Sequence, residues 1–376
     1  MKTRAKVIAI LALGVLLPAN AAAQIQNNVQ IHGFGGWAAG RTDNRNEYGS
    51  IANKETPMDN YYFALSLTAR LERNVSIFVQ PSWQTDLKGE KVNFDYVFMQ
   101  WMLAKPFGLR LGKIKNPVGY YSEVLNVGTL RPFYLIPQGK YIASSQSYIG
   151  MGLTGTVGIG PVEMSYDLFG GLQEFKPIIA DFVMGVNPVT HAPIFVTINV
   201  SPEGRDFAGV HLLFQTPIPG FNLGVNACSM DMYIQFPDGP KMRSGDRRTV
   251  FYVGQAEYKT DRIQLRTEVA SFDDPNTQIH NGYAEAAYAF TPHWQVAADY
   301  DWAKFTVFST SGNVNKHNAV GAALNYWVNP DMVFKLNHYW VEGNGLCKPS
   351  NAAQSSGLGL PQKNTKVWVL GMQFAF

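Results

Sequence analysis

The sequence has 376 residues, of which 13% are aromatic and only 16% are charged, and it contains two cysteines, Cys228 and Cys347. Two cysteines exclude a disulfide-rich scaffold, and their spacing matches no metal or haem motif. With 31 basic and 28 acidic residues, the chain lacks the charge excess typical of nucleic-acid binding. We therefore expect no cofactor, no metal and no nucleic-acid partner. Whether the two cysteines pair stays open.

Residues 1–23 are predicted to be a cleaved secretory signal peptide. Lys2, Arg4 and Lys6 form a positive start, Val7–Leu17 is a short apolar run, and Ala21–Ala23 provide the small residues of a cleavage site. An anchored N-terminal helix, the alternative, would need a longer apolar run. Removal of the three bases leaves 28 basic and 28 acidic residues, so the mature chain is expected to be neutral. Its lack of eighteen-residue apolar runs excludes transmembrane helices.

The mature chain alternates between apolar and polar residues. Tyr61–Leu71 has an apolar side chain at every second position, Arg73 and Asn74 form a tight turn, and Val75–Trp83 alternates again. Such alternation predicts strands, here of about ten residues. The later runs keep this pattern, which would place apolar side chains toward lipid and polar ones toward a water-filled interior.

Short turns and long connections follow one another along the chain. Short turns are expected at residues 104–106, 158–161, 217–220, 259–261, 291–293 and 329–331. Long connections are expected at residues 40–58, 85–91, 116–147, 172–205, 233–247, 273–279, 307–315 and 342–364. This rhythm predicts an all-β fold, a transmembrane antiparallel β-barrel of about sixteen strands over residues 24–376. Tryptophans near strand ends would form interface girdles, namely Trp83, Trp101, Trp294, Trp302 and Trp327.

The last strand has an apolar face that ends on a C-terminal phenylalanine. Its members are Trp368, Leu370, Met372, Phe374 and Phe376. This face resembles the C-terminal insertion signal of bacterial outer-membrane barrels, a resemblance that implies recognition by the barrel-assembly machinery. The alternative is an ordinary edge strand that happens to end the chain.

As architecture, the mature chain resembles the sixteen-stranded diffusion porins of Gram-negative outer membranes. In that family the third long loop, after the fifth strand, bends into the lumen and narrows it. Strands are expected near residues 29–39, 59–72, 75–84, 92–104 and 107–115, which makes residues 116–147 that loop. The loop is interrupted by Pro and Gly and is rich in Tyr and Phe. The resemblance implies a location in the outer membrane, contact with the lipid bilayer and lipopolysaccharide, and a homotrimer.

A shorter resemblance concerns the start of this loop. Gly112–Lys113 followed by Pro117–Gly119 is similar to the point where the fifth strand ends in relatives of the phosphate-selective porins. Such a pore is expected to have a ladder of Arg and Lys, whereas this loop has only Arg131 and Lys140 beside Glu123. We therefore do not transfer phosphate specificity.

Charged residues on inward positions predict an electrostatic filter. The residues expected at the constriction are Arg110, Lys113, Lys115, Glu123, Arg131 and Lys140. The acids expected to face them from later strands are Glu163, Asp167, Glu257, Glu285, Asp299 and Asp301. Opposed charges across a narrow aqueous gap orient dipolar solutes and hinder apolar ones. The alternative is a set of scattered side chains solvated by pore water.

These observations favour passive diffusion of small hydrophilic solutes or ions through the barrel. One alternative is a scaffold or sheath for another protein, which would not conduct alone. A second is an outer-membrane lipid hydrolase, for which His338 is the one candidate base. Ser271 and Ser309 lie at strand ends, but neither has a nucleophile motif around it, so we expect no enzyme activity. The sequence does not reveal the solute, the ion preference or any gating.

Overall fold

The computed structural model describes residues 28–43, 46–51, 58, 60–86, 89–141, 145–175, 178–186, 193–236, 239–307, 314–343, 348–349 and 364–376. The predicted signal peptide and Cys347 lie outside these ranges. Within them, no helix is both long and apolar enough to cross a membrane.

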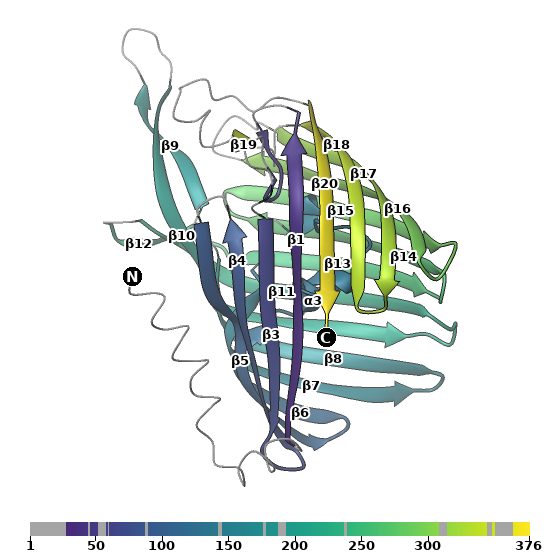
Figure 1. Cartoon of the computed structure of the whole chain (residues 1–376). Coiled ribbons are helices and arrows are strands. Elements are labelled where there is room, and N and C mark those ends of the chain that lie inside the picture. Colours follow the sequence, from purple (N-terminus) through teal and green to yellow (C-terminus); the bar gives the residue numbers. More distant parts are fainter. Residues whose placement is uncertain are drawn as a thin grey trace, which may run out of the picture.

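Sixteen strands form one closed antiparallel barrel (Figure 1). They are β1 (Val29–Thr42), β3 (Asn60–Arg70), β4 (Val75–Asp86), β5 (Gly89–Ala104), β6 (Phe107–Lys115), β7 (Ser147–Ile159), β8 (Val162–Glu174), β10 (Pro193–Gln215), β11 (Phe221–Gln235), β13 (Thr249–Lys259), β14 (Ile263–Asp274), β15 (Thr277–Ala289), β16 (Trp294–Val307), β17 (Val314–Asn329), β18 (Met332–Gly343) and β20 (Asn364–Ala375). The barrel closes at β1, which pairs with β3 on one side and with β20 on the other. The predicted fold class is confirmed.

The remaining strands are additions at the long-loop end. β2 (Asn46–Glu47) pairs with β19 (Lys348–Pro349), β12 (Lys241–Arg243) pairs with the end of β11, and β9 (Ile178–Val186) pairs with the first part of β10. Figure 1 shows the β9–β10 hairpin projecting beyond the barrel rim.

Three connections are shorter than expected. Much of the predicted connection 172–205 is strand, because its Ile, Val and Phe residues suit a β-ladder. Most of the connection predicted at 85–91 is strand, since β4 extends to Asp86 and β5 begins at Gly89. The connection at 273–279 shrinks to a tight turn between Asp274 of β14 and Thr277 of β15.

The alternation of the sequence becomes the two faces of the wall. On β20, Val367 and Val369 are fully buried, whereas the alternate residues Trp368 and Leu370 are 53% and 51% exposed. Apolar side chains on the exposed face and a covered inner face are what a lipid-surrounded barrel requires. Of the predicted girdle residues, Trp83, Trp101 and Trp294 are exposed, while Trp302 and Trp327 are half-buried.

The segment between β6 and β7 lies against the inner face of the barrel. We call residues 116–141 the inner segment. It contains α3 (Tyr120–Val124), the 3-10 helix η1 (Gly128–Leu130) and α4 (Gln138–Tyr141). Its Phe133, Tyr134 and Leu135 pack with buried side chains of β15–β18 and β20. Tyr121 and Tyr141 pack with Tyr283 of β15.

Candidate functional site

Carboxylates of the barrel wall hold the first part of the inner segment. Glu268 of β14 is 0% exposed. It accepts hydrogen bonds from the backbone N–H of Tyr120 at 2.8 Å and from the hydroxyls of Tyr141 and Tyr283. Glu285 of β15 accepts a hydrogen bond from the hydroxyl of Tyr121 at 2.7 Å. Since these donors lie in the low dielectric of a packed interior, they bind the charged acceptors strongly.

Two further wall strands hold the later part of the segment. Both carboxylate oxygens of Asp301 on β16 accept a hydrogen bond from the backbone N–H of Gly139 in α4, each at 2.9 Å. Lys335 of β18, which is 0% exposed, donates to Gln373 at 2.6 Å and to the carbonyl oxygens of Gly128, Arg131 and Phe133. The inner segment is therefore fixed to the wall formed by β14–β20.

Cations and aromatic rings complete this contact. Lys140 Nζ lies 3.7 Å from Glu268 Oε2, 4.5 Å from the ring centre of Tyr141 and 5.2 Å from that of Phe251. Burial lowers the pKa of the Lys140 ammonium, and the carboxylate of Glu268 opposes that shift. Arg266 of β14 lies over the ring of Tyr121, 4.8 Å from its centre. These are cation–π geometries.

The remaining contacts of the inner segment are polar, and part of α3 is exposed. Glu123, in the middle of α3, is exposed, although Tyr121 and Ser122 before it are buried. Asn126 donates to Asp95 of β5, which also accepts from Gln80 of β4 at 2.7 Å. The contact of the inner segment with β4 and β5 is thus polar, and Asp95 and Gln80 are buried in it.

A chain of polar side chains crosses the inner wall from β5 to β13. Arg110 donates to Gln100 and to Asp167, each at 2.9 Å. His211 Nδ1 lies 3.9 Å from Asp167, and its Nε2 lies 3.2 Å from Gln255 Nε2. The chain mixes charges of both signs, with Arg110 and Asp167 in direct contact.

The predicted acids lie in several environments. Glu285 and Asp301 contact the inner segment, and Asp299 is buried between them on the same wall. Asp167 pairs with Arg110, and Glu257 pairs with Arg266 at 2.6 Å. Glu163 pairs instead with Lys105 at an exposed turn. The structure therefore brings together two of the six acids and the predicted loop, and their role in a filter stays a prediction.

Some predicted constriction residues are placed differently from expectation. Lys113 lies directly opposite Val97 and Ile149, which are 41% and 44% exposed on the outer wall, because the strand alternation continues to the end of β6. Arg131 and Lys140 are only 6% and 2% exposed. Both side chains are therefore buried in the contact between the inner segment and the wall, and neither lies on an exposed surface.

The other two constriction residues differ from each other. Lys115 is 7% exposed, at the point where the chain leaves β6 for the inner segment, whereas Glu123 is exposed on α3. The expectation that these loop charges narrow a passage stays a prediction.

Sequence reasoning missed Glu268 and Lys335. Glu268 lies two residues after Arg266 on β14, so the alternation places both on the inner face. Nothing in the local sequence indicates that Glu268 accepts hydrogen bonds from a distant loop. The alternation likewise places Lys335 inside, because it lies between the exposed Phe334 and Leu336, but nothing local indicates its partners. Both contacts join residues far apart in the chain.

The hydrolase alternative can be compared with this geometry. His338 is 8% exposed, with its ring centre 3.8 Å from that of Trp368 and 4.2 Å from that of Trp340. Ser271 is on β14, separated from β18 by β15, β16 and β17. Ser309 lies outside the described residues. This arrangement resembles an aromatic interface cluster more than a nucleophile and its base.

Comparison with known proteins supports the fold. No protein-family model matches the sequence, and no curated protein matches it. Solved structures do match. The outer membrane channel DcaP of Acinetobacter baumannii is 10% identical with a TM-score of 0.57, over 93% of this chain and 97% of that one.

Two further matches agree. OmpF of Salmonella typhi, in complex with daunomycin, is 12% identical with a TM-score of 0.55, over 93% of this chain and 98% of that one. OmpT, an outer membrane protein of Vibrio cholerae, is 9% identical with a TM-score of 0.55, over 93% and 97% of the two chains. At such identities the likeness concerns the fold alone: the chain has the barrel fold of Gram-negative outer-membrane proteins.

Proposed function

We propose that this protein is an outer-membrane porin that allows passive diffusion of small hydrophilic solutes or ions. The observation that carries the proposal is the inner segment, which hydrogen bonds fix to the inner face of a closed barrel, chiefly to β14–β20. A segment fixed in this way would narrow the lumen without depending on a moving lid. Diffusion down a gradient needs no nucleophile, cofactor or energy source.

The chemistry of the two sides of the inner segment supports this proposal. Toward β14–β20, Tyr121, Tyr141 and Phe133 are buried, whereas Asn126 hydrogen-bonds to β5 and Glu123 of α3 is exposed. Arg110 and Asp167 lie on the inner wall, and their side chains are 24% and 19% exposed. A polar path between the inner segment and the β3–β6 side would favour hydrophilic solutes.

The location and assembly form part of the same proposal. A secretory signal over residues 1–23 would export the chain, and the apolar face of β20 would serve as the insertion signal for the assembly machinery. In the outer membrane the barrel would contact lipids and lipopolysaccharide. We propose a homotrimer on the basis of the porin resemblance.

The test is single-channel recording from the purified, refolded protein in a planar bilayer. We expect stable ohmic steps, and a reversal potential under a salt gradient that gives the ion preference. Heat-modifiable gel mobility would show that the barrel is folded. Folded protein without steps would contradict the diffusion pore and would favour the scaffold or sheath, a barrel that does not conduct alone.

A further inference from the structure

Three aromatic rings lie side by side on the inner face of β4 and β5. Phe78 and Phe98 are directly opposite each other on the two strands, and their rings are stacked with centres 4.8 Å apart. The ring centre of Tyr96 lies 5.6 Å from that of Phe98. All three side chains are half-buried, whereas the intervening Val97 is 41% exposed on the outer wall. We call Phe78, Tyr96 and Phe98 the aromatic strip.

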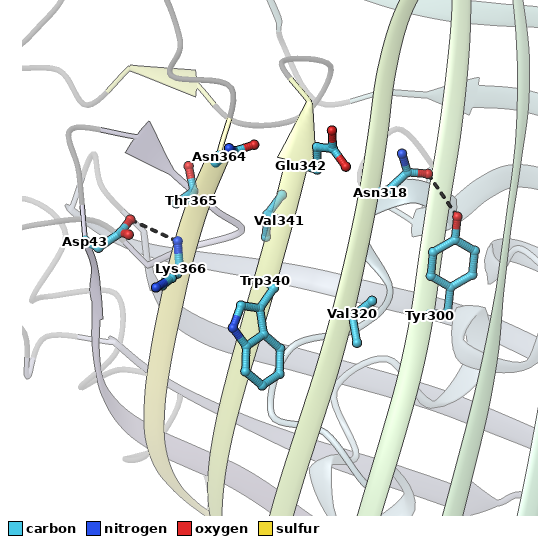
Figure 2. Close-up of a pocket in the computed structure, with 10 residues that line it drawn as sticks. All are labelled: Asp43, Tyr300, Asn318, Val320, Trp340, Val341, Glu342, Asn364, Thr365 and Lys366. Atoms are coloured by element: carbon cyan, nitrogen blue, oxygen red, sulfur yellow. Dashed lines mark hydrogen bonds between the residues drawn. The ribbon is translucent and has the colours of Figure 1, made fainter.

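Aromatic side chains on the outer wall have different surroundings. Figure 2 shows Tyr300 and Trp340 at a hollow over β16–β20, where both are 47% exposed. In the proposed location lipid covers that wall, so aromatic residues there need no further explanation. The aromatic strip faces the interior of the barrel, where the solvent is water. Apolar surface that is left open to water beside polar groups is typical of a ligand site.

The aromatic strip is held in a fixed position. Phe98 packs against the buried apolar cluster of the neighbouring strands. The hydroxyls of Tyr96 and of Ser66 on β3 are hydrogen-bonded at 2.8 Å. Asp95, which precedes Tyr96, accepts a hydrogen bond from Asn126 of the inner segment. The strip therefore lies next to the inner segment, and its rings are pre-organised for binding.

Groups that donate and accept hydrogen bonds continue the inner face beside the strip. Arg110 Cζ lies 6.0 Å from the centre of one ring of the strip. Its Nε donates to Gln100 and its Nη1 to Asp167, while its Nη2 has no hydrogen-bond partner among the described residues. On β7 and β8, the hydroxyls of Thr156 and Ser165 lie 3.2 Å apart. Apart from one ion pair, these hydrogen-bonding groups are neutral.

The charges of this surface cancel. Arg110 and Asp167 are in contact at 2.9 Å, so the pair attracts neither simple anions nor simple cations strongly. A hydroxyl group both donates and accepts, so hydroxyls of a neutral solute can bind Nη2 and the carboxylate without separating the pair. The C–H groups of a sugar ring provide an apolar surface that packs on aromatic side chains.

We propose that the aromatic strip and the Arg110–Asp167 pair form a binding site for neutral sugars inside the barrel. The proposal rests on the proposed porin function and names the class of solute that the pore would favour. An aromatic acid would leave the hydroxyl groups of the site without partners, and an amino acid would have to separate Arg110 from Asp167. The combination of rings with neutral hydrogen-bonding groups therefore selects a sugar.

The test is block of the ion current through the folded barrel, in a planar bilayer, by maltotriose, a neutral trisaccharide. We expect saturable block by maltotriose, and at least about tenfold weaker block by benzoate and by polyethylene glycol of the same hydrodynamic radius. Phe78→Leu/Tyr96→Leu keeps apolar side chains but removes two rings. This double variant should bind maltotriose about tenfold more weakly, since aromatic contacts contribute strongly to affinity.

Controls separate the rings from folding. Phe94→Leu makes the same change on the outer wall of β5, where Phe94 is 45% exposed, and should leave the block unchanged. Heat-modifiable gel mobility would show that each variant is folded. Equal block by maltotriose and polyethylene glycol, stronger block by benzoate, or unchanged block in the double variant would overturn the proposal.

Failure of the pore and failure of the site are distinguishable. Folded protein without current steps would contradict the pore alone. Isothermal titration of the detergent-folded mature chain with maltotriose would then test the site without conduction. Absence of binding, or equal affinity of the unchanged chain and the Phe78→Leu/Tyr96→Leu variant, would overturn the sugar site.

Discussion

Glu268 illustrates how one buried carboxylate can hold a loop inside a barrel. It has no exposed surface, and its donors come from the inner segment and from the neighbouring strand β15. Lys140, also buried, provides the opposite charge at 3.7 Å. Removing one partner of a buried pair costs more than the pair itself contributes, because the other charge stays buried without compensation.

Glu268→Gln should therefore loosen the inner segment. The glutamine keeps the shape but leaves the Lys140 ammonium without a counter-charge, so local opening should become easier by about 3 kcal/mol. Amide hydrogen exchange of residues 117–141 measures this directly, and we expect about hundredfold faster exchange. Glu163→Gln removes an exposed partner of Lys105 and should leave exchange unchanged. Equal exchange in the two variants would show that Glu268 does not fix the segment.

Gly139 is required where α4 meets the wall. A Cβ atom at this position would lie 2.3 Å from Asp301 Oδ1 and 2.7 Å from the carbonyl oxygen of Trp302. Gly139→Ala should therefore displace α4, at a cost of about 1–3 kcal/mol. Acetylation of Lys140 by a small amine reagent, followed by mass spectrometry, should be faster in this variant. Gly158→Ala, where a Cβ meets no atom within 4 Å, is the matched control. A Lys140 that stays protected would contradict the prediction.

At the scale of elements, the closing strand pair β1–β20 depends on aromatic rings over glycines. The ring of Phe376 covers Gly33, with its Cζ 2.1 Å from where a Cβ would be, and the ring of Phe374 lies over Gly35. Backbone hydrogen bonds join Gly33 and Phe376 in both directions, at 2.9 and 2.8 Å. The apolar face predicted for the last strand thus also covers a first strand that is poor in side chains.

Phe376→Ala should weaken this closure. Loss of the ring contacts over Gly33 should lower the free energy of unfolding by about 1 kcal/mol, because dispersion contacts are lost even where lipid surrounds the wall. Urea unfolding in lipid vesicles, followed by Trp fluorescence, measures the change. Phe290→Ala removes an exposed aromatic ring, 47% accessible, at another strand end. If both variants lose the same stability, the ring over Gly33 has no special role.

The sequence predicted most strands because a wall between water and lipid imposes a period of two. β6 has the expected bounds, and β3 begins and ends within two residues of expectation. The inner segment was predicted as a loop from its Pro and Gly residues. Asp301 was expected to face this segment across a gap, but its hydrogen bond and those of Glu268 and Lys335 were not predicted, since they join positions separated by more than a hundred residues and depend on barrel closure. Lys113 was misplaced although Leu109 and Leu111, in the same phase of β6, mark the outer face, and the alternation continues to the end of the strand.

At the scale of the whole molecule, the charges inside the barrel divide into buried and exposed ones. Arg131 and Lys140 are buried where the inner segment contacts the wall. Glu123 is exposed on the inner segment, and Arg110 with its partner Asp167 is half-buried on the inner wall of β6 and β8. If solutes pass beside this second group, ion preference depends on exposed charge rather than on every charge of the loop.

A comparison of Glu123→Gln with Arg131→Gln tests this division. Removing the exposed carboxylate should shift the reversal potential under a salt gradient toward anion preference. Removing the Arg131 charge should shift it toward cations by less, because a guanidinium only 6% exposed lies farther from the passing ions, and salt screens charges beyond about 10 Å at 0.1 M. Glu72→Gln, at the exposed turn between β3 and β4, should produce no shift and provides the control for net charge. A larger shift with Arg131→Gln than with Glu123→Gln would place the conducting path beside Arg131 and would contradict the prediction.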